Sequence, residues 1–159
     1  MIEIQDEIIN KLQSLIGVSS KIGFTNSGIL IDLSEPVERI ILNILFVEDE
    51  EFEYIPYQTF SMNIFEGISF PDIGGVIDLG EMTIERIDVF SKSFFVSDSE
   101  LIFYSESVLL LNFVNKERVL VELSGDQILH ELISIYNNNG INDRISELIE
   151  EGNSRTRII

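Results

Sequence analysis

The residues with the clearest potential for chemistry are carboxylates gathered in one short acidic segment beside an aromatic side chain. The segment that we expect to contact a partner consists of Glu48, Asp49, Glu50, Glu51, Glu53 and Tyr54. Several carboxylate oxygens close together could hold a hard cation such as Ca²⁺, but the run lacks the alternating ligands and the glycine of an EF-hand loop. An aromatic anchor ringed by carboxylates suits an interface for a basic protein, and the sequence predicts that role here.

The remaining motifs do not predict a catalytic or metal centre. His130 is the only histidine and there is no cysteine, so a zinc site lacks its usual ligands. No Gly-x-Ser-x-Gly motif occurs, and a Ser-His-Asp triad would have to use His130. The glycine-rich run 74–80 is followed by Glu81 and Met82, where a phosphate-binding loop needs Lys and Ser or Thr. We therefore expect no metal, no cofactor and no catalytic residue. The 28 acidic residues leave a carboxylate-based enzyme as a less favoured alternative.

The formal net charge of −18 is the most unusual property of the composition. Residues 1–90 carry 17 acids against four bases, and residues 91–159 carry 11 acids against six bases. Such a chain repels nucleic-acid phosphates and anionic membrane surfaces, because both bind proteins largely through Lys and Arg. It attracts basic proteins and cations instead. We predict no nucleic-acid partner and no membrane partner.

These observations favour a non-catalytic acidic protein-binding module. A small inhibitor or immunity-type protein that neutralises a basic partner fits the size and charge of the chain. The alternative is a structural protein that assembles into a homo-oligomer through a sheet edge or a helical stripe. High charge of one sign also promotes solubility, so the charge alone does not separate these hypotheses.

The order of the elements predicts an α+β fold. Ile4, Ile8, Leu12 and Leu15 have helical spacing, so we expect a helix over 3–16 that ends at Gly17. Apolar runs separated by turn residues then predict a mostly antiparallel, multi-stranded sheet. The predicted strands cover 21–25, 29–33, 37–47, 52–65, 76–79, 82–90, 93–97, 100–105, 107–114 and 117–123.

Two C-terminal helices are expected to close the chain. Ser124–Gln127 fits a capping box ahead of an apolar stripe that extends to about residue 137. Asn142 or Asp143 could cap a second, shorter helix that ends at Gly152. Residues 153–159 are predicted to be a loose tail. The size of the chain, residues 1–159, predicts a single domain.

The compartment is predicted from what the sequence does not contain. The N-terminal residues lack the basic start and apolar core of a signal peptide. No apolar run approaches the roughly 20 residues that span a bilayer. The missing cysteine fits a reducing compartment, so we expect a cytoplasmic protein.

Overall fold

The computed structural model describes residues 3–25, 28–48, 56–67, 75–96, 101–123, 133–136 and 139–159. Within these ranges, two helices and nine strands follow one another in a mostly antiparallel arrangement. In chain order they are α1 (Asp6–Leu15), β1 (Ser19–Phe24), β2 (Gly28–Ser34), β3 (Val37–Glu48), β4 (Pro56–Glu66), β5 (Ile77–Val96), β6 (Leu101–Phe113), β7 (Arg118–Leu123), β8 (Ile133–Tyr136), α2 (Ile141–Glu150) and β9 (Arg155–Ile158). The predicted α+β class with an N-terminal helix and an antiparallel sheet is confirmed.

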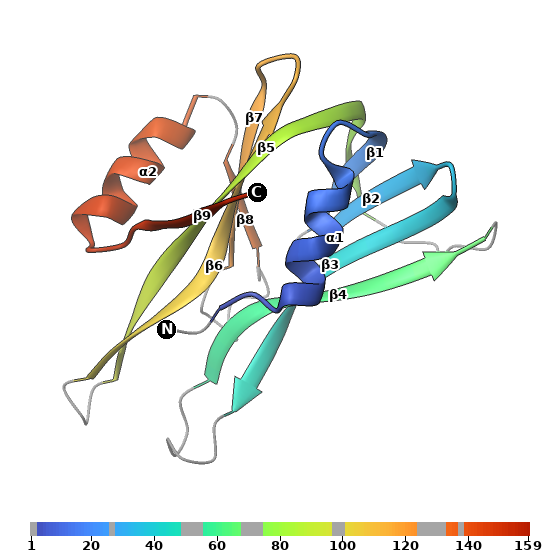
Figure 1. Ribbon diagram of the computed structural model, residues 1–159. Coiled ribbons are helices and arrows are strands. Elements are labelled where there is room, and N and C mark those ends of the chain that lie inside the picture. The colour runs from blue at the N-terminus through green and yellow to red at the C-terminus, as the bar shows by residue number, and fades with distance from the viewer. Residues whose placement is uncertain are drawn as a thin grey trace.

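One sheet connects all of the described strands, in the order β4-β3-β2-β1-β5-β6-β7-β8. β9 pairs with β5 outside this path. Every pairing is antiparallel. β5 joins the two halves of the sheet: its first part pairs with β1, and its later part pairs with β9 along the same edge. Figure 1 shows β1–β4 on one side of the molecule and β5–β8 on the other.

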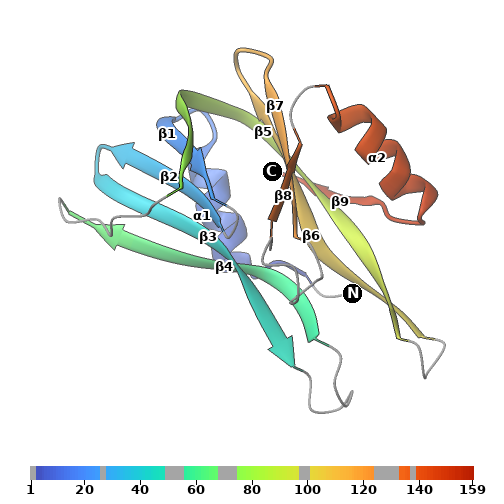
Figure 2. The ribbon, with the colours of Figure 1, turned by 180° about the vertical axis from the view of Figure 1, so that it is seen from behind.

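The larger hydrophobic core fills the inner face of this curved sheet and is covered by α1. Ile8, Leu12 and Leu15 lie on one side of α1, as their spacing predicts, and all three are buried. They pack in a cluster with inward residues from both halves of the sheet, such as Ile40 of β3 and Leu109 of β6. β4 comes close to β6 although the two strands do not pair. The view from behind shows α1 beyond the strands of the first half (Figure 2).

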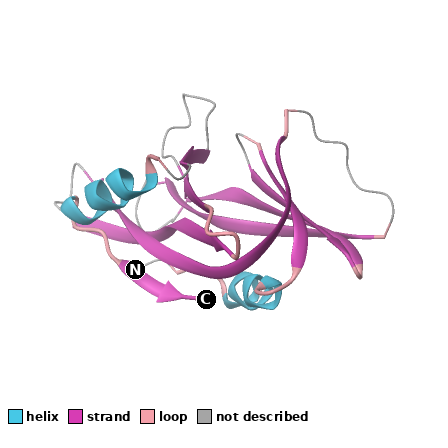
Figure 3. Cartoon of the chain, turned by 90° about the horizontal axis from the view of Figure 1, so that it is seen from above, coloured by secondary structure: helices cyan, strands magenta, loops and turns pink. Residues whose placement is uncertain are grey.

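α2 covers the opposite face of the second half of the sheet. The strand β6 contributes side chains to both cores, because successive side chains of a strand point to opposite faces. Leu109 belongs to the α1 core, whereas Leu110 packs in a smaller cluster with Ile141 and Leu148 of α2. The two helices therefore lie on opposite faces of the sheet (Figure 3).

β5 is much longer than the sequence predicts. Residues 77–96 form one strand of 20 residues, where we expected three short strands over 76–79, 82–90 and 93–97. The expected breaks are local irregularities in a continuous strand. Gly80 has a φ of 75°, which glycine adopts without steric cost. Shifts of register occur between Ile84 and Arg86 and between Phe90 and Ser91, and such bulges bend a strand without ending it.

The prediction of two C-terminal helices is wrong. In the part of the chain that the structure describes, one helix lies near each end of the sequence, α1 and α2. The first of the two predicted C-terminal helices was expected to reach residue 137, but Ile133–Tyr136 is a strand that pairs with β7. The predicted capping box at 124–127 lies outside the described residues. α2 begins after Gly140 without a side-chain cap, so neither Asn142 nor Asp143 caps it.

The C-terminal residues are not a loose tail. Arg155–Ile158 forms β9 and pairs with β5. The backbone N–H and C=O of Ile159 both hydrogen-bond to Ile87 at 2.8 and 3.0 Å. Composition gave no reason to expect this, because a four-residue strand with two arginines shows no apolar alternation. The open edge of β5 supplies the backbone partners, and two buried carboxylates pair with the arginines.

Candidate functional site

The predicted contact segment lies almost entirely outside the described residues. Glu48 is the last residue of β3 and stands opposite Pro56, the first residue of β4. Asp49, Glu50, Glu51, Glu53 and Tyr54 lie outside the described residues, so their role stays a prediction. The two strands that flank the segment pair along their whole length, so the acidic segment follows one strand of a long hairpin and precedes the other.

The described residues include all ten lysines and arginines of the chain. With partners among the described residues, eight of the ten form ion pairs with carboxylates. These are Lys11, Arg39, Arg86, Lys92, Lys116, Arg144, Arg155 and Arg157. Of the other two, Arg118 donates a hydrogen bond to Asn142 at 3.0 Å. Most of the positive charge is therefore neutralised within the molecule.

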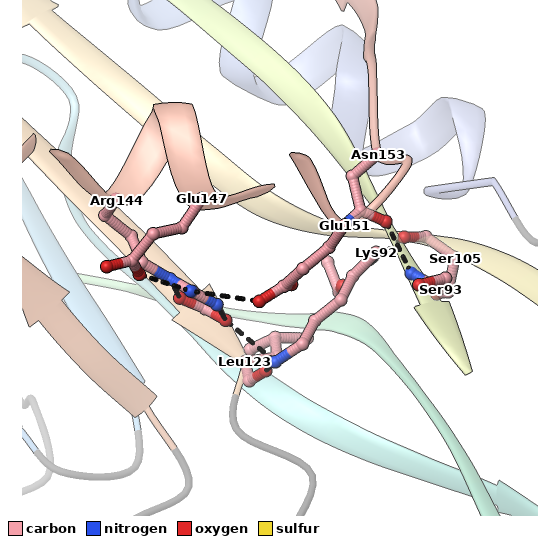
Figure 4. Close-up of polar contacts among 10 residues, drawn as sticks. Lys92, Ser93, Ser105, Leu123, Arg144, Glu147, Glu151 and Asn153 are labelled. Atoms are coloured by element: carbon pink, nitrogen blue, oxygen red, sulfur yellow. Dashed lines mark hydrogen bonds and ion pairs between the residues drawn. The ribbon is translucent and has the colours of Figure 1, made fainter. Parts of the chain in front are cut away.

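Glu122 of β7 is the centre of the largest ion-pair network. Its side chain is buried beneath α2 and accepts two hydrogen bonds from Arg144, at 2.8 and 2.6 Å. Lys92 of β5 donates a third at 2.7 Å and also approaches the carbonyl of Leu123. Arg144 reaches Glu147 at 2.9 Å and Glu151 at 3.7 Å (Figure 4). The network thus fastens α2 to two strands of the sheet.

The pKa of Glu122 is lowered by this network. Burial of the carboxylate raises its pKa, but the hydrogen bonds from Arg144 and Lys92 favour the charged form and outweigh burial. The same contacts raise the pKa of Arg144. Glu122 is therefore held as an anion, which suits a structural ion pair rather than a proton donor.

Glu106 of β6 forms a second network, on the face that α1 covers. It accepts hydrogen bonds from Nε and Nη2 of Arg157, at 2.8 and 2.6 Å, and from the hydroxyl of Thr156 at 2.6 Å. The backbone N–H of Ile4 donates another at 2.8 Å. Burial raises the pKa of Glu106, yet these hydrogen bonds lower it overall. One carboxylate therefore ties both ends of the chain to the centre of the sheet.

A bulge explains why Glu106 and Glu122 face opposite sides. Val108 stands opposite both Phe90 and Glu122, whereas Glu106 stands opposite Ser91. The register shift leaves Ser107 without a partner on β5 and reverses the alternation along β6. Val108 and Glu122 consequently face α2, and Glu106 faces α1. A strict alternation along β6 would have placed Glu106 with Val108.

Asp88 of β5 forms a third cluster, next to α2 and β9. Its Oδ2 atom accepts hydrogen bonds from Nε and Nη2 of Arg86, at 3.2 and 3.1 Å, and from Asn112 at 2.9 Å. Its buried Oδ1 atom accepts no hydrogen bond, and the nearest cation there is Arg155 Nη1 at 3.5 Å. The cluster lies at a groove of about 370 Å³ whose other walls are apolar.

The carboxylates left without an ion pair are all exposed. Within the described ranges, and leaving aside Glu48, whose side chain is not described, they are Asp6, Glu7, Glu35, Glu66, Asp78, Glu81, Glu117, Asp143 and Glu150. They occur on both helices, on β4, on β5 and in two turns. The surface that solvent meets is therefore acidic, while most cations face buried or partly buried acids.

Metal and membrane features were sought over the same ranges. Among the described residues, no group of three or more His, Asp or Glu side chains is arranged to hold a metal ion. His130 lies outside those residues. No described helix has both the length and the apolar character needed to cross a bilayer.

Comparison with known proteins identifies no relative of this chain. No protein-family model, no curated protein and no solved structure matches it.

The four buried acids among the described residues, Glu38, Asp88, Glu106 and Glu122, were not singled out from the sequence. Glu122 interrupts the apolar run Leu120–Leu123 and Asp88 lies between Ile87 and Val89, whereas Glu106 lies between two serines. Alternation alone assigns such a residue to the solvent face. The signal in the sequence is the small number of basic residues, because ten cations can form ion pairs with only some of the 28 acids.

Proposed function

We propose that this chain is a non-catalytic acidic module that binds a basic protein, in the manner of a small inhibitor or immunity protein. The observation that carries the proposal is the distribution of charge. Eight of the ten cations form ion pairs with described carboxylates of the same chain, and nine described carboxylates are exposed without an ion pair. A surface of this kind attracts a basic partner from a distance and speeds its association.

The same distribution argues against a polyanionic partner. Binding to a nucleic acid depends on lysines and arginines that can displace counterions from phosphates. Here the cations are mostly engaged with carboxylates, and Lys92 and Arg144 are largely buried. We therefore propose that neither nucleic acids nor anionic membranes are partners. A cytoplasmic location belongs to the proposal, on the ground of the missing cysteine.

The buried carboxylates support a non-catalytic role. A carboxylic acid that donates a proton near neutral pH needs a raised pKa. The pKa values of Glu106 and Glu122 are lowered, because each carboxylate is surrounded by cationic and hydrogen-bond donors. Their contacts hold α2, β9 and the N-terminal residues in place, which is a structural task.

The partner can be sought by affinity capture. The full-length chain, immobilised, is incubated with lysate of its source organism at low salt and eluted with rising salt. We expect a stoichiometric basic protein that elutes with salt, because exposed charge pairs are screened at high ionic strength. Recovery of an acidic or neutral protein that resists salt would contradict the proposal.

Charge reversal tests the predicted contact segment directly. Glu50→Lys with Glu51→Lys should slow association with the captured partner about tenfold at low salt, with little effect at high salt. The matched control is Glu35→Lys with Glu66→Lys, which changes the net charge equally. Glu66 pairs with β3 at the opposite end of the hairpin from Glu48, roughly 30 Å away at the rise of a β-strand. Equal slowing by both double variants would refute the assignment of the segment.

Self-assembly is the second candidate function, and one feature of β4 favours it. β4 is an end strand of the sheet's path, and Val37, Ile64 and Phe65 near its last residues are exposed apolar side chains. An open edge with apolar neighbours is a template for pairing with another chain. Light scattering over a range of protein concentrations separates the two candidates: a stable dimer without the partner would favour assembly.

A further inference from the structure

A groove between α2 and the strands β5 and β9 combines apolar walls with two arginines. Phe90 and Leu110 line it from the sheet, and Ile145 and Ile149 line it from α2. Its volume of about 370 Å³ is within the range of binding sites for small groups. Ile149 is 57 % exposed, so the groove carries apolar surface that no described residue covers.

The charges at the polar end of the groove do not balance. Arg86 and Arg155 contribute two positive charges, and Asp88 is the single carboxylate among the lining residues. One positive charge is therefore left over, in a molecule whose net charge is −18. A ligand with one carboxylate would restore the balance locally.

The two guanidinium groups also have donors to offer. Arg86 uses Nε and Nη2 for Asp88, which leaves its Nη1 group. Arg155 makes no hydrogen bond through its side chain in the part of the chain that the structure describes, and its contact with Asp88 is 3.5 Å long. The two side chains are 50 % and 52 % exposed. Arginine presents its N–H groups in a fork that matches a carboxylate.

The openness of the groove indicates what kind of ligand it takes. Because both arginines and Ile149 remain about half exposed, a bound group would keep one side in solvent. That arrangement fits the end of a polypeptide, where an aliphatic side chain and a free carboxylate share one residue and the rest of the chain leads away. We propose that this groove binds the C-terminal residue of a partner polypeptide, with its aliphatic side chain against Ile145 and Ile149 and its carboxylate on Arg86 and Arg155.

This inference is independent of the acidic segment and its basic partner. Residues of α2, β5, β6 and β9 line the groove, whereas the acidic segment follows β3. Figure 1 shows α2 and β3 on different sides of the molecule. The ligand of the groove is anionic, so it would not compete with a cationic surface for the same residues. Failure of one proposal leaves the other standing.

Three short peptides test the two features of the ligand separately. Acetyl-Gly-Gly-Leu with a free carboxylate carries both, its carboxamide form lacks the charge, and acetyl-Gly-Gly-Gly with a free carboxylate lacks the aliphatic side chain. Each is titrated into the isotope-labelled full-length protein and followed by NMR. We expect the first peptide to shift resonances of α2 and β9 saturably. Each of the other two should bind about tenfold more weakly, the effect of losing one charge-assisted hydrogen-bond pair or the burial of one side of a leucine side chain.

Variants of the groove locate the binding. Arg155→Gln should weaken binding of the free-carboxylate peptide about tenfold and leave the weak binding of the carboxamide unchanged. Ile149→Ser changes an exposed residue, so it should preserve the fold while weakening binding of both Leu peptides. Lys116→Gln is the matched control, because it removes a 79 % exposed cation that does not line the groove. Thermal unfolding of each variant verifies that it is folded.

The results that would overturn the proposal are specific. They are the absence of any saturable shift with the free-carboxylate peptide, equal binding of the carboxamide, or equal weakening by Lys116→Gln and Arg155→Gln. The last result would mean that the net charge, rather than the groove, attracts the peptide. Shifts confined to residues outside α2, β5, β6 and β9 would also refute the assignment.

Discussion

Replacing Glu122 by glutamine should destabilise the protein strongly, because two cations depend on this one carboxylate. Glu122 accepts three hydrogen bonds, from Lys92 and from two nitrogens of Arg144, and is only 3 % exposed. Glutamine has almost the same shape, so the substitution removes the charge without opening a cavity. It leaves the two cations facing each other beneath α2 with no anion between them.

The expected loss follows from the burial of the partners. Removing one member of a buried ion pair costs about 3–5 kcal/mol, because the remaining charge is left uncompensated. Arg144 retains Glu147 and Glu151, and both cations keep some contact with solvent, so we expect the lower end, about 3 kcal/mol. For a domain of this size that loss lowers Tm by roughly 6–12 °C.

Chemical denaturation followed by circular dichroism measures the loss directly. The control is Glu117→Gln, which removes an exposed carboxylate without an ion pair and should change the stability by less than about 0.5 kcal/mol. Adding Lys92→Met to Glu122→Gln removes one of the two stranded cations, so the double variant should be more stable than Glu122→Gln alone. A loss below about 1 kcal/mol for Glu122→Gln, or no rescue by Lys92→Met, would refute the view that the network fastens α2 to the sheet.

Two further predictions concern Glu106, another buried carboxylate, and its partner Arg157. The pKa of Glu106 in the folded protein is below its ordinary value of 4.5, so its contribution to stability is present above that value and is lost as the pH falls through the folded pKa. The Glu106→Gln variant should therefore lose this part of the acid sensitivity. The difference in unfolding free energy between the variant and the unchanged protein, measured by denaturation at each pH, should shrink between pH 5 and pH 3. A constant difference would contradict the assignment. Arg157→Met should destabilise the protein by about 3 kcal/mol, because it leaves Glu106 buried with Thr156 and Ile4 as its only described donors. Hydrogen exchange should then show faster exchange at Ile159, and unchanged exchange there would argue that β9 is held by its backbone bonds alone.

Local patterns in the sequence predicted the elements whose signal is carried by neighbouring residues. The spacing of Ile8, Leu12 and Leu15 predicted α1, and Gly17, with a φ of 78°, follows it as expected. The predicted strands 107–114 and 117–123 leave two residues for the turn between β6 and β7, and Lys116 in that turn has a φ of 72°. Three consecutive residues of β3 are all buried, as a strand covered on both faces requires: Ile40, Ile41 and Leu42.

Patterns failed where distant contacts override a local preference. Ser91 and Lys92 look like the end of a strand, but β5 continues through them, because both residues pair with β6 and Lys92 forms an ion pair with Glu122. Residues 133–136 have the apolar spacing of a helix, yet they form the strand β8, which pairs with β7. Strand pairing is a long-range interaction, and its partners are not visible in a local window.

The fold class, the N-terminal helix, the position of most strands and the large negative charge follow from the sequence alone, since each of these depends on composition or on the spacing of nearby residues. Three features required the folded chain: the burial of Asp88, Glu106 and Glu122 with cations, the strand that holds Arg155 and Arg157, and the apolar groove beside α2 that two arginines face. These features join residues up to 102 positions apart, as in the hydrogen bond from Ile4 to Glu106. A carboxylate becomes buried when folding brings cations to it, and no property of the carboxylate's own neighbours in the sequence reveals that.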